Sequence, residues 1–187
     1  MRRSSSIKGV RIVGVDDGRF NKSDEKASLF ALIMQDYKIV DLKVTDIQVD
    51  GLDVTDAIKR LLSKVYFEVI MLSGVSFAGF NIVNIHDLYE FFKKPILIIT
   101  GDKPKAKAIR RALKLHFDDW RTRWSLIKKC GKIRRIKTSK NYKPIYYEAL
   151  GIERLNAVRL LRELTLIGRF PEPIRVARLI SKHLTQR

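Results

Sequence analysis

The chain has 187 residues, 45% of them hydrophobic, which is enough to bury a core without disulfides or structural metals. Its single cysteine, Cys130, excludes an internal disulfide, and no apolar run approaches the roughly 20 residues that span a bilayer. The opening M-R-R-S-S-S-I-K-G is charged and has no apolar core, unlike a signal peptide. We therefore expect a cytoplasmic protein.

The formal net charge of +18 is unevenly distributed. Residues 1–100 carry 14 Lys and Arg against 13 Asp and Glu, whereas residues 101–187 carry 24 against 7. Such a field attracts polyanions. An anionic membrane or a merely solubilising surface are the other interpretations, and we predict nucleic acid, DNA or RNA, and no membrane.

The first part of the chain predicts three strands, at residues 10–15, 27–34 and 37–49, with a polar loop at 19–26. Short links between them suggest an antiparallel meander. A helix follows at residues 54–65, where apolar side chains recur with helical spacing. Asp53 stands where its N-cap belongs.

Alternating strands and helices come next. We expect a buried strand at residues 68–72, a glycine-containing loop at 73–81 and a helix at 84–92, then a strand at 95–100 and a basic helix at 104–117. Three antiparallel strands followed by these units form a ribonuclease H-like arrangement, an α/β fold with a mixed five-stranded sheet and flanking helices.

The last third is basic. We expect a helix that carries Trp120 and Trp124, and an interrupted segment at residues 128–143 with a short strand or hairpin. A strand at 145–149 and helices at 153–167 and 173–184 would complete the chain. We predict one domain over residues 1–187, in which 118–187 form a basic, mainly helical extension.

Two adjacent carboxylates, Asp16 and Asp17, end the first strand. Successive strand side chains point to opposite faces, so both cannot reach one ion if the strand runs through them. In a ribonuclease H-like sheet the first strand presents one carboxylate to Mg²⁺ and the adjacent fourth strand another, and the bound cation activates water for phosphodiester hydrolysis. Asp16 is therefore the candidate ligand, unless Asp17-Gly18 only turns the chain.

The fourth strand ends at Ser73, where such a site needs an acid, and serine supplies no charge for Mg²⁺. Asp53 is a second candidate metal ligand as well as the candidate N-cap. The sequence thus favours a metal site at Asp16, whereas Ser73 on the neighbouring strand argues against one.

Candidate nucleic-acid contacts come from two regions. The loop G-V-S-F-A-G-F-N could bring backbone amides to a phosphate and a ring to an unstacked base, although both phenylalanines could equally fill the core, which we favour. The stretch from W-R-T-R-W to Tyr142 mixes cations and aromatics. The candidates from these regions are Phe77, Gly79, Phe80, Asn81, Arg121, Arg123, Lys128, Lys129, Arg134, Arg135 and Tyr142.

Other chemistries have little support. The three histidines show no ligand spacing and Cys130 has no C-x-x-C partner. The chain has neither a G-x-x-x-x-G-K-[ST] phosphate loop nor a G-x-S-x-G elbow. We therefore expect no nucleotide triphosphate, zinc or serine-hydrolase function.

The segment G-R-F-P-E-P-I-R-V-A-R, residues 168–178, resembles the closing motif of endonuclease V, a Mg²⁺-dependent nuclease that acts near deaminated purines. The chain is more similar still to a mostly archaeal family related to endonuclease V and labelled domain of unknown function 99. The motifs V-D-D-G-x-F, D-G-L-D-x-T and G-x-x-F-A-G-F-N carry that similarity, at residues 15–20, 50–55 and 74–81.

The resemblance implies a set of catalytic positions. Asp16 matches the first catalytic aspartate, Asp53 is the nearest candidate for the catalytic glutamate, and Lys103, after the fifth strand, is the candidate for a catalytic lysine. Ser73 stands at the second strand aspartate and Ile152 at the histidine, so two functional groups of the nuclease are replaced.

We accordingly expect a nucleic-acid-binding relative of endonuclease V with weak or altered Mg²⁺-dependent phosphodiesterase activity, and with Mg²⁺ held at Asp16 and Asp53. The alternatives are a non-catalytic nucleic-acid-binding module that has lost its metal site, and a protein–protein adaptor in which the charge is incidental.

Overall fold

A mixed seven-stranded sheet, in the order β3-β2-β1-β4-β7-β9-β8, forms the centre of the computed structural model, which describes residues 7–21 and 23–185. The strands of this sheet are β1 (Arg11–Asp17), β2 (Lys26–Gln35), β3 (Lys38–Gln48), β4 (Val69–Leu72), β7 (Ile96–Thr100), β8 (Arg134–Ile136) and β9 (Ile145–Leu150). A separate two-stranded sheet pairs β5 (Ser76–Phe77) with β6 (Asn81–Ile82).

The first five strands of the main sheet confirm the predicted ribonuclease H-like order. β1 pairs antiparallel with β2, and β2 with β3, whereas β1, β4 and β7 are parallel neighbours. β1 therefore lies inside the sheet, and the chain leaves β1 and β4 at the same edge.

The sheet is larger than the five strands expected. β9 pairs antiparallel with β7, with Ile98 opposite Glu148, and β8 pairs antiparallel with β9. A strand at residues 145–149 and a short strand or hairpin within 128–143 are predicted, but as parts of a basic helical extension and not of this sheet. They form because Ile145 and Tyr147 alternate toward the core and give β9 a buried face.

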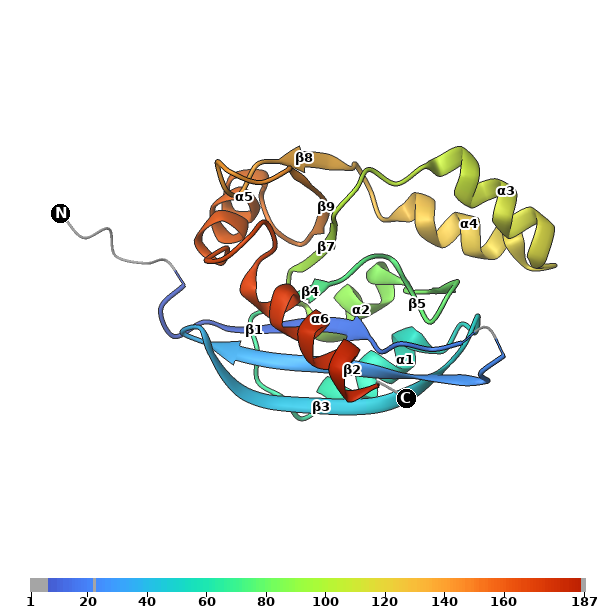
Figure 1. The fold of residues 1–187 in the computed structure, drawn as a ribbon, viewed down its shortest axis with the longest axis horizontal. Coiled ribbons are helices and arrows are strands. Elements are labelled where there is room, and N and C mark those ends of the chain that lie inside the picture. The colour runs from blue at the N-terminus through green and yellow to red at the C-terminus, as the bar shows by residue number, and fades with distance from the viewer. Residues whose placement is uncertain (1–6, 22, 186–187) are drawn as a thin grey trace.

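Helices cover both faces of the sheet (Figure 1). The helices are α1 (Val54–Leu62), α2 (Ile85–Phe92), α3 (Ala106–His116), α4 (Trp120–Lys129), α5 (Arg154–Glu163) and α6 (Glu172–Leu184). The apolar sides of α1 and α2 share one core with β1, β2 and β4. α5 and the start of α6 share a second core on the opposite face, and α3 and α4 contact each other as a helical pair.

α6 lies directly on β1 and β2 (Figure 1). A side chain at Gly14 would place its Cβ 2.2 Å from the backbone oxygen of Pro173, so only glycine allows this approach. α6 therefore covers the face of β1 that carries Asp16. In the part of the chain that the structure describes, no helix combines the length and apolarity needed to cross a membrane.

Candidate functional site

β1 runs through both aspartates and separates them. The Asp16 carboxylate faces α6, where its Oδ2 accepts a hydrogen bond from Ser181 Oγ at 2.7 Å. The Asp17 carboxylate faces the loop after β4 and accepts one from the backbone N–H of Ala78 at 2.6 Å. Strand alternation thus assigns the two carboxylates to different partners.

Arg178 of α6 links Asp16 to Ser73 at the ends of β1 and β4. Its Nε donates to Ser73 Oγ at 2.7 Å and lies 3.9 Å from Asp16 Oδ1. The guanidinium carbon lies 4.2 Å from the centroid of the Phe170 ring, a cation–π contact. The position where the sequence lacks an acid is therefore adjacent to a cation.

Burial dominates the electrostatics of this cluster. Burial raises the pKa of Asp16, whereas the Ser181 and Ser73 hydroxyls and the cations Arg178 and Lys182 act in the opposite direction. Burial likewise raises the pKa of Asp17 to about 6, opposed by its hydrogen bond from Ala78. The pKa of Arg178 is lowered by burial and, to a smaller extent, by Arg169.

The loop after β4 is held by the D-G-L-D segment. Asp50 Oδ1 accepts from Phe80 N at 2.7 Å, and Asp50 N donates to Ala78 O at 2.8 Å. Gly79 has a φ of +87°, and a Cβ there would lie 2.3 Å from Asp50 Oδ1. The glycine is required by both its backbone conformation and the close carboxylate.

Asn81 ties the same loop to α1. Its amide nitrogen donates to Gln48 O at 2.9 Å and to Asp53 Oδ1 at 2.6 Å, and its amide oxygen accepts from Val54 N at 3.1 Å. Asp53 occupies the N-cap position, but its side chain makes no capping hydrogen bond. Asn81 supplies that acceptor instead, from a distant part of the chain.

Several of the candidate nucleic-acid contacts are structural. Phe77 and Asn81 are buried, so neither side chain is available to a base or phosphate in this structure. Phe80 is half-buried and stacks edge-on with Phe117 at 5.4 Å between ring centroids. For Phe77, the structure supports the core interpretation.

Arg123 anchors α4 to this loop. The buried guanidinium donates to Gly51 O at 2.9 Å, to Phe80 O at 2.7 Å and to Asp119 Oδ1 at 2.7 Å. It is thus engaged by the protein and is not an exposed phosphate contact. Its role is to dock the α3–α4 pair beside the loop that contacts Asp17.

The other basic candidates remain accessible. Arg121, Lys128, Lys129, Arg135, Tyr142 and Lys103 are exposed, and Arg134 is partly so. Arg134 and Arg135 lie on β8, where a hollow of about 430 Å³ is also lined by Lys132, Lys137, Arg154 and Arg162. A second hollow, of about 340 Å³, is lined by Lys107, Arg110, Arg111 and Lys114 of α3.

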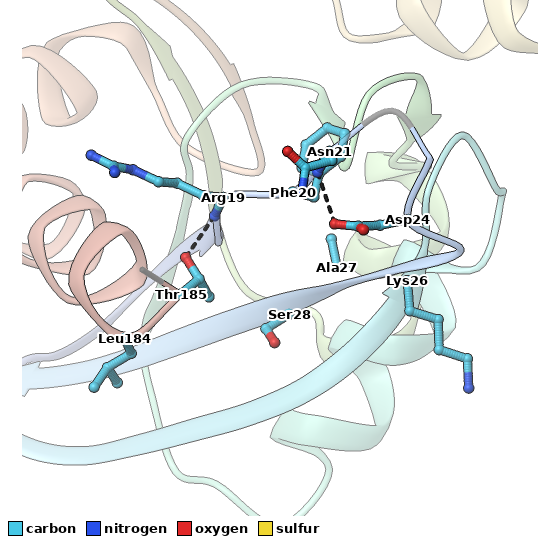
Figure 2. Close-up of a pocket in the computed structure, with 9 residues that line it drawn as sticks. All are labelled: Arg19, Phe20, Asn21, Asp24, Lys26, Ala27, Ser28, Leu184 and Thr185. Atoms are coloured by element: carbon cyan, nitrogen blue, oxygen red, sulfur yellow. Dashed lines mark hydrogen bonds between the residues drawn. The ribbon is translucent and has the colours of Figure 1, made fainter. Parts of the chain in front are cut away.

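A further pocket, of about 400 Å³, lies between the β1–β2 connection and the end of α6 (Figure 2). Arg19 N donates to Thr185 Oγ1 at 2.7 Å, and Thr185 Oγ1 donates to Ser181 O at 2.6 Å. Since Ser181 in turn donates to Asp16, the pocket adjoins the Asp16 cluster through the last turns of α6. Phe20 of the V-D-D-G-x-F motif lines it.

The residues around Asp16 do not fit a dedicated Mg²⁺ site. Magnesium requires several oxygen ligands, usually with carboxylates among them. Here one oxygen of Asp16 is engaged by Ser181, and the Ser73 oxygen accepts from a guanidinium. Asp53, the N-cap residue of α1, is engaged by Gln48 of β3 and Asn81 of β6. Residues 7–21 and 23–185 contain no group of three or more His, Cys, Asp or Glu able to hold a metal ion.

Sequence reasoning missed Arg178 and Ser181 as members of the cluster. The spacing of α6 places Arg178 outside its apolar stripe, which by itself indicates only a solvated side chain. Ser181 pairs with Asp16 across 165 residues. No local pattern carries that information, although the G-R-F-P-E-P-I-R-V-A-R motif contains Arg178.

Comparisons with known proteins find relatives that match most of the chain. A UPF0215 protein of Methanosarcina mazei is 35% identical over 181 residues, which cover 94% of this chain and 91% of that protein. The structure is similar to a protein of unknown function from Archaeoglobus fulgidus, with a TM-score of 0.84 and 23% identity over 95% of this chain and 99% of the other.

A more distant structural match is endonuclease V of Ciona intestinalis, crystallised as its D234N variant with a 23-mer DNA that contains an inosine followed by a ribo-adenosine. The TM-score is 0.62 at 16% identity, over 91% of this chain and 83% of that one, which shows the fold alone. The model of the family described as Endonuclease dU matches residues 8–185. The chain belongs to the endonuclease dU family, and it shares the ribonuclease H-like fold of endonuclease V.

Proposed function

We propose that this protein binds nucleic acid, with the α3 surface as its main contact to the phosphate backbone. One observation carries the proposal: the hollow on α3 is lined by four cations and nothing else, Lys107, Arg110, Arg111 and Lys114. α3 contains no acidic residue. Closely spaced cations release counterions when they contact successive phosphates, which drives sequence-independent binding.

Two further features support the same proposal. Trp120 of α4 has Lys114 at 4.8 Å and Arg121 at 4.7 Å from its ring centroid, so an aromatic platform lies among the cations. Arg123 docks the α3–α4 pair against the loop beside Asp17. The pocket next to Asp16, which Phe20 lines, is of a size that would take one unstacked nucleotide.

Charge removal on α3 tests the proposal. We expect Lys107→Gln/Arg111→Gln to weaken binding of a duplex oligonucleotide and to reduce the slope of log K against log salt by about 2, since each phosphate contact contributes about 0.9. The matched control is Arg60→Gln/Lys64→Gln, which removes two exposed charges from α1 and the turn after it. Fluorescence anisotropy between 50 and 300 mM KCl measures both.

Equal effects of the two double variants would contradict a binding surface on α3. Binding that does not depend on salt would contradict phosphate contact altogether and would favour the protein–protein adaptor.

Metal-dependent phosphodiester cleavage is the alternative function that the family name and the place of Asp16 at the end of β1 raise, and the donor set at Asp16 argues against it. Because the donor set does not fit Mg²⁺, we expect the wild type to nick deoxyuridine- or inosine-containing DNA or RNA no faster than Asp16→Asn in Mg²⁺ or Mn²⁺. Cleavage by the wild type that Asp16→Asn abolishes would show that the protein is a nuclease with Asp16 in its site.

A further inference from the structure

The charge balance at the ends of β1 and β4 differs from that of a metal site. A site that holds a divalent cation is built with an excess of carboxylates. Here two carboxylates, Asp16 and Asp17, are accompanied by three cations: Arg178 acts on both carboxylates, Lys182 acts on Asp16, and Arg169 acts on Arg178. Ser73, on the neighbouring strand, adds no charge. The cluster therefore carries net positive charge before any ligand binds.

We propose that the Arg178 guanidinium takes the place of a divalent cation at this site and binds a phosphate group of the nucleic acid directly. The proposal rests on the proposed nucleic-acid binding, and it assigns to α6 a phosphate site separate from the basic surface of α3. Asp16 and Ser73 then act as positioning residues for Arg178.

The contacts of Arg178 leave its two terminal guanidinium nitrogens available to a ligand. Nε is engaged by Ser73 at 2.7 Å, and the guanidinium lies against Phe170, so the orientation of the group is restrained. No residue at positions 7–21 or 23–185 accepts a hydrogen bond from its two terminal nitrogens. The side chain remains 26% exposed. A restrained guanidinium with free terminal N–H groups matches the bidentate geometry of phosphate.

A second guanidinium lies against the same ring. Arg169 is 5.0 Å from the Phe170 centroid and donates to Gly101 O at 3.0 Å, at the end of β7. Holding two like charges beside one ring costs free energy, and an anion bound between or beside them offsets that cost. Because Asp16 neutralises only part of this charge, we expect it to oppose anion binding while it orients Arg178.

Asp16 provides the sharpest test, because the two kinds of site predict opposite effects. At an arginine site, Asp16→Asn removes a competing negative charge, so affinity for an oligonucleotide in EDTA should rise about threefold. At a metal site, the same change removes a ligand, so affinity should fall and the wild type should need Mg²⁺ or Mn²⁺. Anisotropy in EDTA and in Mn²⁺ distinguishes the two.

Arg178 variants give the complementary measurement. We expect Arg178→Met to lower oligonucleotide affinity about tenfold and Arg178→Lys to lower it less, since lysine keeps the charge and loses the fork. Arg175→Met is the matched control on the same helix, because Arg175 is paired with Glu172 at 2.6 Å. Circular dichroism and the melting temperature establish that each variant is folded.

A probe that does not depend on nucleic-acid binding completes the design. Inorganic phosphate, titrated against a chloride control, should shift the Arg178 Nε–Hε resonance in ¹⁵N spectra of the wild type and should shift it further in Asp16→Asn. Weaker oligonucleotide binding by the α3 variant with no phosphate effect at Arg178 would overturn this inference and leave the proposed function intact. Mn²⁺ binding that Asp16→Asn abolishes would overturn the inference as well.

Discussion

Glu148 is a buried carboxyl group outside the Asp16 cluster. It is 7% exposed, and its Oε2 has no hydrogen-bond partner among the residues that the structure describes, as is also true of Thr100 Oγ1. Burial raises the pKa of Glu148 to about 7. Burial, together with Glu148, raises the pKa of Cys130 to about 12, so the thiol stays protonated and unreactive at neutral pH.

The raised pKa of Glu148 predicts a loss of stability as pH rises. The folded state binds the proton more tightly than the unfolded state, so the stabilisation is complete below about pH 4.5 and is lost as pH rises through 7. A shift of this size corresponds to about 3 kcal/mol. Urea unfolding at pH 5 and pH 8 should show that loss in the wild type and a much smaller loss in Glu148→Gln.

Glu153→Gln serves as the control for this measurement, since Glu153 is exposed at the start of α5. If the free energy of unfolding changed with pH equally in the wild type and in Glu148→Gln, the Glu148 carboxyl group would already be solvated or paired in solution.

At the residue scale, the sequence predicts what alternation and local spacing control. The separation of Asp16 from Asp17 follows from strand geometry alone. The sequence does not reveal the roles of Asn81 and Arg123 because, Asp119 apart, their partners lie 27 to 72 residues away. An exposed phosphate contact and a buried carbonyl anchor use the same residue type, so only the fold distinguishes them.

Among the elements, the α3–α4 pair is held by Arg123, by the contact of Phe117 with Phe80, and by His86 at Lys129 O. Arg123 is 6% exposed and satisfies two carbonyls and one carboxylate. Its removal leaves two part-buried carbonyls without that donor, which costs about 1–3 kcal/mol for each group that water does not reach, whereas the Asp119 carboxylate is 40% exposed and can be hydrated.

We therefore predict that Arg123→Ala loosens the α3–α4 pair locally. Hydrogen exchange should accelerate for the amides of α4 and for the loop at Phe80, while the β1 and β4 amides keep their protection. Lys128→Ala, an exposed change on the same helix, should leave the whole pattern unchanged. Identical exchange in the two variants would contradict the anchoring role of Arg123.

The sequence predicts a helix or strand well where the element is long or strongly periodic. β1, β2, β4, α1 and α6 are long or apolar enough for their pattern to stand out. β8 has three residues, and β5 and β6 have two each, which is too short for any period to be read. α5 ends at Glu163, four residues before the predicted end, and Leu166 and Ile167 are exposed rather than part of its apolar face.

For the whole molecule, the uneven charge has a cost of its own. Residues 101–187 carry 24 basic side chains against 7 acidic ones, so repulsion opposes the compact state. We predict that the melting temperature rises by a few degrees between 50 and 500 mM NaCl, because the Debye length shrinks to a few ångströms. The rise should be smaller in Lys107→Gln/Arg111→Gln, and a flat or falling curve would mean that the repulsion is already balanced.

The order of the first five strands is the part of the fold that the sequence predicts best. The addition of β8 and β9 to the sheet is the part it predicts least, since strands are expected at these positions but within a basic helical extension. That continuity supports our proposal that residues 1–187 make one domain, with 118–187 as its extension.

The hydrogen bond between Asp16 and Ser181 spans almost the whole described chain. A ribosome adds residues at about 5–20 per second, N-terminus first. Many seconds therefore separate the synthesis of Asp16 from that of α6, the helix that covers it. Until α6 has been synthesised, the end of β1 carries the Asp16 carboxylate without the Arg178 guanidinium beside it. Anion binding at this site is therefore a property of the finished polypeptide, and a nascent or truncated chain that ends before α6 should repel phosphate there.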